Sequence, residues 1–322
     1  MMTRSRAPLV AAAMTMMLAA SSAARAQDRY AEVVERILEA WKTADCVCLG
    51  EDHDRYYDNE LRLALVRHPA FPRTVRAVVV EMANPVHQDL LDHFILDGAS
   101  MTRDSLAPIW QDATNPEVWE SPIYEELLRA IREVNLHLPR DQRVCVLAGD
   151  SKVDWSKITQ PDQLIPFMNR GSNIRDIIAV QVLDAHQKAL AIYGAGHCNK
   201  VGTGFPGQLA GRYGKERFWS ISPLIRRAGI EKGRALFELG SEPAYVVIGG
   251  SRWASMPAAN MLTPALGEYT FGQLYDAIIY HGEVADSVVG PGMAAFRTRM
   301  GAELDRRAQI LTDAVKLRQK RP

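Results

Sequence analysis

Ionisable side chains follow four short apolar runs of this chain, and carboxylate and imidazole groups are the pair that general acid–base chemistry needs. Each run has the length and composition of a buried parallel strand. Because ligands bind beyond the carboxyl ends of parallel strands, we expect these side chains to meet at one edge of one sheet. They are Glu51 and His53 after 45–50, Glu81 at the end of 76–81, Asp150 after 143–149, and His197 after 189–195.

Glu51 and His53 are two residues apart, so their side chains can point to the same side at a strand end. A carboxylate beside a histidine fixes its tautomer and raises its basicity, as a general base requires. The alternative is that the pair opens a solvated loop. Glu81 can hold a catalytic water, pair with Arg175, bind a metal, or form a simple salt bridge at the sheet end.

His197 follows Gly194 and Gly196, and glycines at a strand end allow a ligand or backbone to approach closely. The alternative is a histidine packed in the turn. Further residues are candidates for binding substrate, and for each of them the alternative to a binding role is ordinary packing or exposure to solvent. They are Asp150, Tyr56, Tyr57, Trp110, Trp119, and Arg175 with Asp176, the last two expected in the first turn of a helix over 173–187 capped by Ser172.

The remaining histidines lack partner spacing, so we expect them at the surface or at helix caps. The sequence contains no His-Glu-x-x-His pair, no Gly-x-Ser-x-Gly elbow and no P-loop. This group of histidines is His68, His87, His93, His137, His186 and His281.

The elements that must position these residues alternate between strand and helix, which predicts an α/β fold with a mostly parallel sheet and helices on both faces. Residues 98–122 interrupt the alternation with three prolines, a glycine and two tryptophans, and predict an irregular insertion that acts as a lid. Helices are expected over 28–44, 59–67, 84–96, 123–136, 173–187 and 294–320, with further strands at 216–220, 244–249 and 275–280.

The first 26 residues predict a cleaved signal peptide, with an arginine-containing start, a short apolar run and Ala24-Arg25-Ala26 as the cleavage site. We therefore expect residues 27–322 to form a single domain that is periplasmic or secreted, without a stable membrane span. Removing the leader leaves 35 basic and 38 acidic residues, a charge of −3. That charge argues against a nucleic-acid partner.

The four cysteines show no zinc-site spacing. Export would permit disulfides. Cys46 and Cys48 alternate on one strand, and Cys145 lies inside another. We expect all four, Cys198 included, to be buried small hydrophobic residues and not to form a disulfide.

Taken together, the motifs resemble the superfamily of erythromycin esterases and ChaN-like proteins, and the ChaN-like branch more closely. The similarity extends from about residue 45 to 280. It is carried by Leu49-Gly50-Glu51-Asp52-His53-Asp54, Val80-Glu81-Met82 with Gln88 downstream, Arg175-Asp176, Gly194-Ala195-Gly196-His197, and Tyr275-Asp276-Ala277-Ile278-Ile279.

The resemblance implies an α/β fold with its site at the strand ends, and it offers two functions. Erythromycin esterases hydrolyse a macrolide lactone without a metal, which would make His53 the water-activating base with Glu51, Glu81 and His197 around it. The expected function is thus an exported hydrolase acting on an ester or related bond of a small molecule, a reaction that requires no cofactor.

ChaN-like proteins are linked instead to haem binding and iron uptake, often as lipoproteins, and this chain has no lipobox cysteine. A haem-binding protein using the same cleft, capped by Trp110 and Trp119, is therefore the alternative. The related Tiki proteases are metal-dependent, which keeps a divalent metal as a further alternative.

Overall fold

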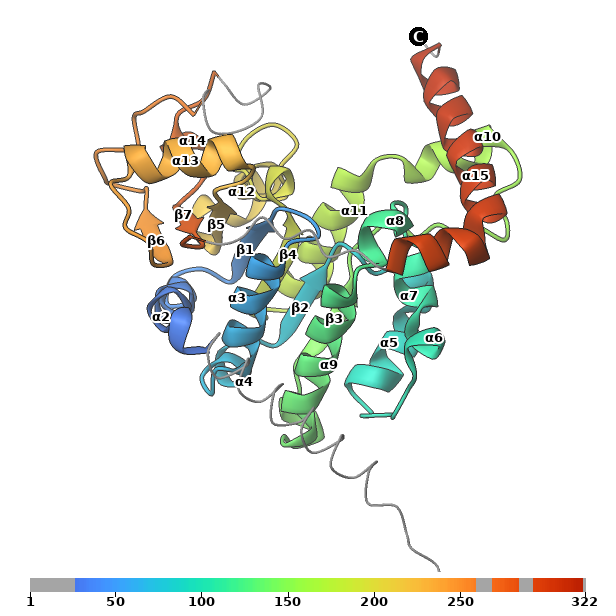
Figure 1. Ribbon diagram of the computed structural model, residues 1–322, viewed down its shortest axis with the longest axis horizontal. Coiled ribbons are helices and arrows are strands. Elements are labelled where there is room, and N and C mark those ends of the chain that lie inside the picture. The colour runs from blue at the N-terminus through green and yellow to red at the C-terminus, as the bar shows by residue number, and fades with distance from the viewer. Residues whose placement is uncertain (1–26, 259–267, 284–291, 321–322) are drawn as a thin grey trace, which may run out of the picture.

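A seven-stranded sheet forms the centre of the molecule in the computed structural model, which describes residues 27–258, 268–283 and 292–320 (Figure 1). The strand order is β3-β2-β4-β1-β5-β7-β6, and β6 alone of these seven runs antiparallel to its neighbour. The mostly parallel α/β fold is confirmed. The strands are β1 (Cys46–Glu51), β2 (Ala77–Val80), β3 (Cys145–Ala148), β4 (Ala189–Gly194), β5 (Phe218–Pro223), β6 (Ala244–Val247) and β7 (Ala277–Tyr280).

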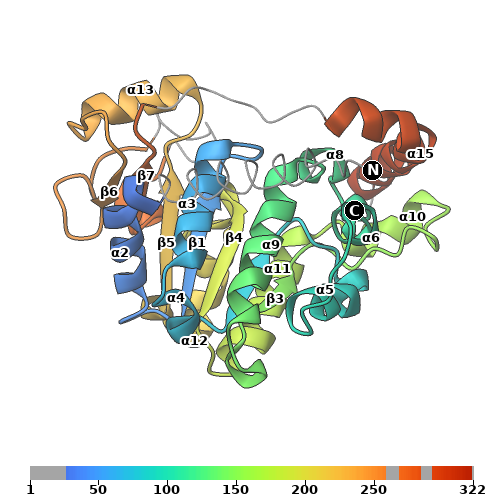
Figure 2. The same ribbon diagram turned by 60° about the horizontal axis from the view of Figure 1, so that its bottom comes forward.

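The central strands are apolar along their whole length because helices cover both faces of the sheet (Figure 2). Alternate residues of β1 enter opposite cores: Val47 and Leu49 on one side, Cys46 and Cys48 on the other. The first core packs α2 (Ala31–Ala40), α3 (Tyr56–Arg67), α5 (Gln88–Ile95) and α9 (Pro122–Leu136), and the second packs α11 (Arg170–Ile177), the π-helical η4 (Ile178–Leu183), α12 (Phe205–Tyr213) and α14 (Phe271–Leu274).

The insertion at 98–122 folds into three one-turn helices, α6 (Arg103–Leu106), α7 (Pro108–Gln111) and α8 (Pro116–Trp119). Proline occupies the start of α7 and α8, where its fixed φ suits a helix. Trp110 and Trp119 are each about 1% exposed and belong to the first core. The insertion is therefore anchored to the body of the protein by its tryptophans.

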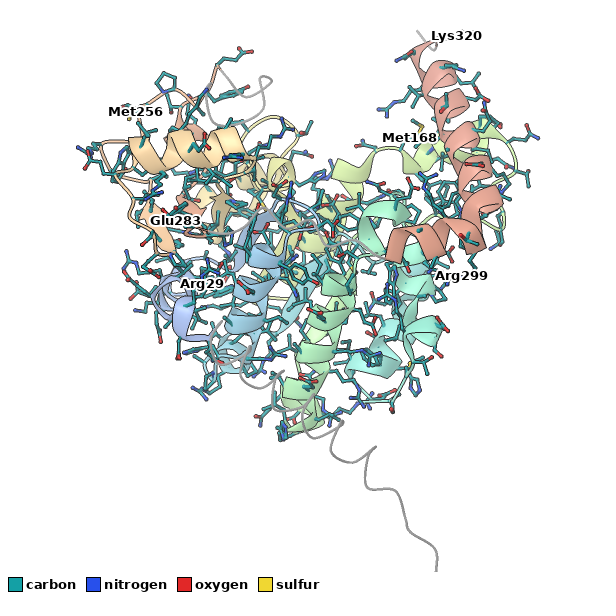
Figure 3. The ribbon with its side chains drawn as sticks, in the orientation of Figure 1. Arg29, Met168, Met256, Glu283, Arg299 and Lys320 are labelled. Atoms are coloured by element: carbon teal, nitrogen blue, oxygen red, sulfur yellow. A yellow bond between two sulfur atoms is a disulfide. The ribbon has the colours of Figure 1, made fainter. Side chains whose placement is uncertain are left out.

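A separate small core attaches the last helix, α15 (Gly292–Gln319), to the segment that follows β3. Trp155 and Leu164, from the latter segment and α10 (Pro161–Leu164), pack against Ile310 and Ala314 of α15. Met168 lies beside this core (Figure 3). Two further α-helices are α4 (Phe71–Thr74), which is a single turn, and α13 (Arg227–Leu236).

The helix expected over 173–187 begins earlier than predicted. Its N-cap is Asn169 in place of Ser172, and Arg175 lies in the last turn of α11, not in a first turn. The polar run around residue 170 contains several residues that favour caps, so the sequence alone does not single out the start.

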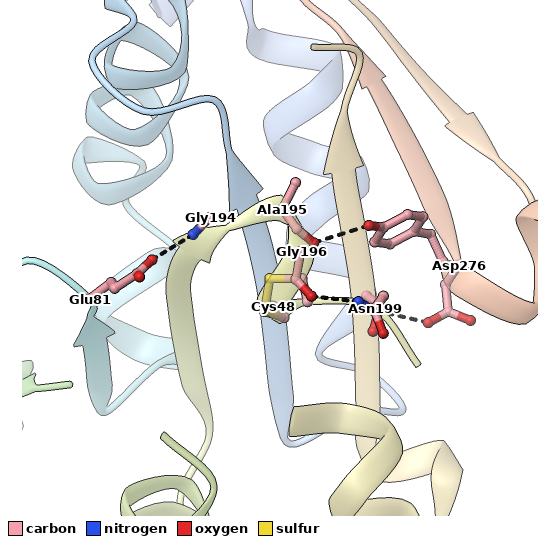
Figure 4. Close-up of a disulfide and its surroundings, with 10 residues drawn as sticks. Cys48, Glu81, Gly194, Ala195, Gly196, Asn199 and Asp276 are labelled. Carbon is pink, nitrogen blue, oxygen red and sulfur yellow. Dashed lines mark hydrogen bonds between the residues drawn. A yellow bond between two sulfur atoms is a disulfide. The ribbon is translucent and has the colours of Figure 1, made fainter. Parts of the chain in front are cut away.

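The prediction that no cysteine forms a disulfide is wrong for two of the four. Cys48 of β1 and Cys198, which follows β4, are bonded across a sequence separation of 150 residues (Figure 4). Parallel pairing of β4 with β1 brings the Cα atoms within 5.4 Å, a proximity that sequence spacing does not reveal. Cys46 and Cys145 are free thiols. Cys46 is buried as expected, whereas Cys145 is only partly buried, so the expectation of burial is wrong for it.

The predicted signal peptide, residues 1–26, lies outside the described residues. Among the helices that are described, none has the length and apolar character needed to cross a bilayer.

Candidate functional site

The candidate site lies at the point where the strand order of the sheet reverses, beside the β4–β1 pair. Strands β2 and β3 lie on one side of the β4–β1 pair, and β5, β7 and β6 lie on the other. Such a reversal opens a crevice at the carboxyl ends of parallel strands, where open α/β sheets bind ligands. Glu51 ends β1, Glu81 follows β2, and His197 lies in the short helix η5 (Ala195–His197) after β4.

Glu51 and His53 form a close pair at the end of β1. The Nδ1 atom of His53 lies 2.7 Å from Oε1 of Glu51. The Glu51 side chain is 3% exposed, whereas the imidazole of His53 is 34% exposed. An ionised Glu51 accepts a hydrogen bond from Nδ1–H, so the neutral ring carries its lone pair on Nε2, the arrangement of a general base.

Two side chains from helices hold Glu51 in its charged form. Arg62 of α3 donates to Oε2 of Glu51, and both side chains are almost fully buried. The hydroxyl of Tyr124 on α9 donates to Oε1 over 3.3 Å. Burial alone would raise the pKa of Glu51, but the charge of Arg62 and the hydrogen bond from His53 outweigh it and lower the pKa.

Glu81 and His197 form a second carboxylate–imidazole pair. Nε2 of His197 lies 3.4 Å from Oε1 of Glu81, and the other oxygen accepts the Gly194 N–H over 2.8 Å (Figure 4). Glu81 is 3% exposed and His197 29%. The second pair therefore repeats the first: a buried carboxylate orients a partly exposed ring.

Gly194 lies between the two pairs. A Cβ atom at this position would lie 2.9 Å from His53 Nε2 and 3.6 Å from Glu81 Oε2. Glu81 also acts electrostatically on Glu51, opposing the lowering of its pKa. One member of each pair, His53 and Glu81, therefore lies next to Gly194.

The insertion completes one wall of the site through Trp119. Its ring meets the His53 imidazole edge to face at 4.8 Å and the Tyr124 ring at 5.0 Å. Trp110, in contrast, donates its indole N–H to Glu120. Of the two tryptophans predicted to cap the cleft, Trp119 is the one placed against a site residue.

The other predicted binding residues have different surroundings. Asp150 accepts hydrogen bonds from the backbone and hydroxyl of Thr114. Arg175 pairs with its neighbour Asp176 at the surface, and the predicted pairing of Arg175 with Glu81 is not observed. Tyr56 is 40% exposed, whereas Tyr57 is buried with its hydroxyl 3.4 Å from Asp52.

Sequence reasoning missed Arg62, Tyr124, Asp58 and His281. The expectation that His281 is a surface or capping residue is wrong, because it is 3% exposed and hydrogen-bonded to Asp58. A signal was present: His281 directly follows β7, as the predicted site residues follow theirs. Arg62 and Tyr124 lie inside helices, where no strand-end pattern marks them.

Across residues 27–258, 268–283 and 292–320, no group of three or more His, Cys, Asp or Glu side chains is arranged to hold a metal ion. The four central residues are instead organised as two separate pairs, each with one hydrogen-bonded carboxylate.

Residues 37–147 match the family described as haem-binding uptake, Tiki superfamily, ChaN. This match confirms the resemblance to ChaN-like proteins over these residues. A comparison with curated protein sequences finds no significant match.

Two solved structures share the fold. One is a protein from Bacillus cereus, 12% identical, with a TM-score of 0.53 over 79% of this chain and 92% of that chain. The other is a mutant of the erythromycin esterase EreC in its open conformation, 11% identical, with a TM-score of 0.53 over 81% and 95% of the two chains. At these identities the similarity establishes the fold alone.

Proposed function

We propose that this chain is an exported hydrolase that activates water with His53 and cleaves an ester or related bond of a small molecule. The observation that carries the proposal is the contact of His53 with a buried Glu51 that Arg62 and a hydrogen bond keep ionised. This arrangement fixes the ring, directs its basic Nε2 toward Gly194 and Glu81, and leaves a third of the side chain open to substrate.

In the proposed reaction, Nε2 of His53 removes a proton from a water molecule as its oxygen attacks the substrate carbonyl. Glu51 remains ionised and stabilises the imidazolium that forms. Collapse of the tetrahedral intermediate breaks the bond to the leaving oxygen, which receives the proton from the His53 imidazolium and so restores the neutral ring. General base assistance of this kind contributes about 10²–10⁴-fold to the rate.

Glu81 and His197 are proposed to act on the substrate side of the same centre. The imidazole of His197, oriented by Glu81, is proposed to contact the substrate next to its carbonyl group. Trp119 limits the freedom of the His53 ring and supplies an apolar surface. Arg175 and Tyr56, both exposed, are candidates for contacts with the outer parts of a substrate.

A panel of small-molecule esters, including lactones, tests the proposal with purified protein beginning at Gln27. On the best substrate, we expect His53→Ala to lower kcat/KM by about 10²–10⁴-fold with little change in melting temperature, because the side chain lies outside the core. His93→Ala is the matched control, since His93 is an exposed histidine that pairs only locally with Asp97. Near-normal turnover by His53→Ala would disprove the base assignment.

Haem binding is the second candidate, favoured by the description of the matching family. His53 and His197 are partly exposed at the site and would supply the iron ligand. Titration with haemin distinguishes the two proposals: a Soret shift with one-to-one stoichiometry, lost in His197→Ala, supports binding, and its absence together with esterase activity supports hydrolysis.

A further inference from the structure

A second cluster of ionisable groups is buried behind the candidate site. Tyr30, Asp58 and His281 are between 0% and 4% exposed, and they come from the start of α2, the first turn of α3 and the end of β7. Nδ1 of His281 lies 3.0 Å from the Tyr30 hydroxyl, and Nε2 lies 3.0 Å from Oδ1 of Asp58. The rings of Tyr57 and Tyr30 pack against the imidazole.

Burying such groups is costly unless each is paired, and apolar residues would fill the same space at lower cost. Because the cluster of Tyr30, Asp58 and His281 is buried, it cannot bind a substrate directly. An effect on the chemistry must therefore pass through the residues it contacts.

The cluster ends on the turn that carries His53. The second oxygen of Asp58 accepts the backbone N–H of Asp52 over 3.0 Å. The N–H of Asp54 is held on the other side by the Tyr124 hydroxyl, 3.1 Å away. Asp54 has a φ of +62°, in the left-handed region that aspartate enters more readily than most non-glycine residues.

Asp52 separates Glu51 from His53, so the position of its peptide group fixes the geometry between carboxylate and imidazole. We propose that Asp58 and His281, supported by Tyr30, are positioning residues that hold the Glu51–Asp52–His53 turn in its reactive geometry. This inference rests on the proposed function. A displacement of about 1 Å at a reacting group can cost about 10²-fold in rate.

The first test compares Asp58→Ala with the conservative Asp58→Asn. Asparagine keeps an oxygen for the Asp52 N–H and can donate to His281, so we expect nearly normal kcat. Alanine removes both partners, and kcat should fall about 10–100-fold while KM changes by less than about threefold. A purely structural role would lower the melting temperature but leave kcat of the folded protein unchanged in both variants.

The second test does not depend on activity. In ¹⁵N-histidine NMR spectra, we expect the Nδ1–H signal of His53 to be protected from exchange in the native protein and in Asp58→Asn, and to broaden or vanish in Asp58→Ala. If Asp58→Ala does not fold, Tyr30→Phe, which keeps the ring packing, should shift the same signal to a smaller extent.

An unchanged His53 signal in every folded variant would overturn the inference. Absence of ester hydrolysis by the native protein, combined with the expected change in the His53 signal, would refute the proposed function while supporting the positioning role.

Discussion

At the scale of single residues, the site depends on keeping a buried carboxylate charged. Glu51 is surrounded by protein, and desolvation favours its neutral form. Arg62 and His53 reverse that preference, and Tyr124 contributes a further hydrogen bond. Burial raises the pKa of Tyr124 well above its ordinary value, so its hydroxyl remains a donor across the physiological range.

This balance predicts a pH dependence of stability. The pKa of Glu51 is lower in the folded protein than its ordinary value of 4.5, so its ionisation stabilises the fold above that pH. The contribution is lost as the pH falls through the lowered pKa. We expect Glu51→Gln to cost about 3–5 kcal/mol at neutral pH because Arg62 is left buried without its partner.

Urea denaturation of both proteins over a pH series measures this difference. The gap in unfolding free energy between native protein and Glu51→Gln should be widest above pH 4.5 and should narrow on acidification. A gap that is small at neutral pH, or independent of pH, would show that Glu51 is not ionised in the fold.

At the scale of elements, the turn at the end of β4 places the backbone of Gly194, which has no side chain, next to the His53 ring. Gly194 closes β4 and also donates its N–H to Glu81. Tyr275 donates to the carbonyl of Ala195, and Asn199 donates to that of Gly196 (Figure 4). The turn is therefore fixed from several sides and cannot easily retreat from a larger residue.

Two glycines of this turn make a matched pair of variants. Gly194→Ala would place a methyl group 2.9 Å from His53 Nε2, so we expect kcat to fall by about 10²-fold through displacement of the ring. Gly196→Ala meets nothing within 4 Å and should leave activity nearly unchanged. Steady-state kinetics of the two purified variants provides the comparison, and equal behaviour of the two would contradict this geometry.

At the scale of the whole molecule, the disulfide connects the first strand to the turn that carries His197. Cys48 and Cys198 are 150 residues apart in the sequence, so their bond closes a long loop and strongly restricts the unfolded chain. We expect Cys198→Ser, or reduction of the native protein, to lower the free energy of unfolding by about 2–5 kcal/mol.

Urea titration with and without dithiothreitol measures this effect. Cys145→Ser is the control, because Cys145 is a free thiol on β3 and its replacement leaves the disulfide intact. Identical unfolding midpoints in the two buffers would mean that the bond does not stabilise the fold.

The sequence predicts the strands and the four central site residues because both follow local rules. Strands buried on two faces are continuously apolar, and ionisable residues at their ends are visible as interruptions. Arg62 and Tyr124 lie on helices and reach Glu51 through packing, which has no local signature. The Cys48–Cys198 bond depends on β4 lying beside β1, a matter of strand order that spacing does not encode.

The strand order also has a consequence for how the chain assembles during synthesis. β1 emerges first, yet both of its neighbours, β4 and β5, begin at residues 189 and 218. Until then β2 and β3 can pair with each other, while β1 has no partner strand. Once β4 has been synthesised, it has to enter between β1 and β2, and it brings His197 and Cys198 to their places together. A nascent chain halted before residue 189 would leave both edges of β1 and one edge of β2 unpaired. Such a chain would need protection from aggregation until β4 and β5 had been synthesised.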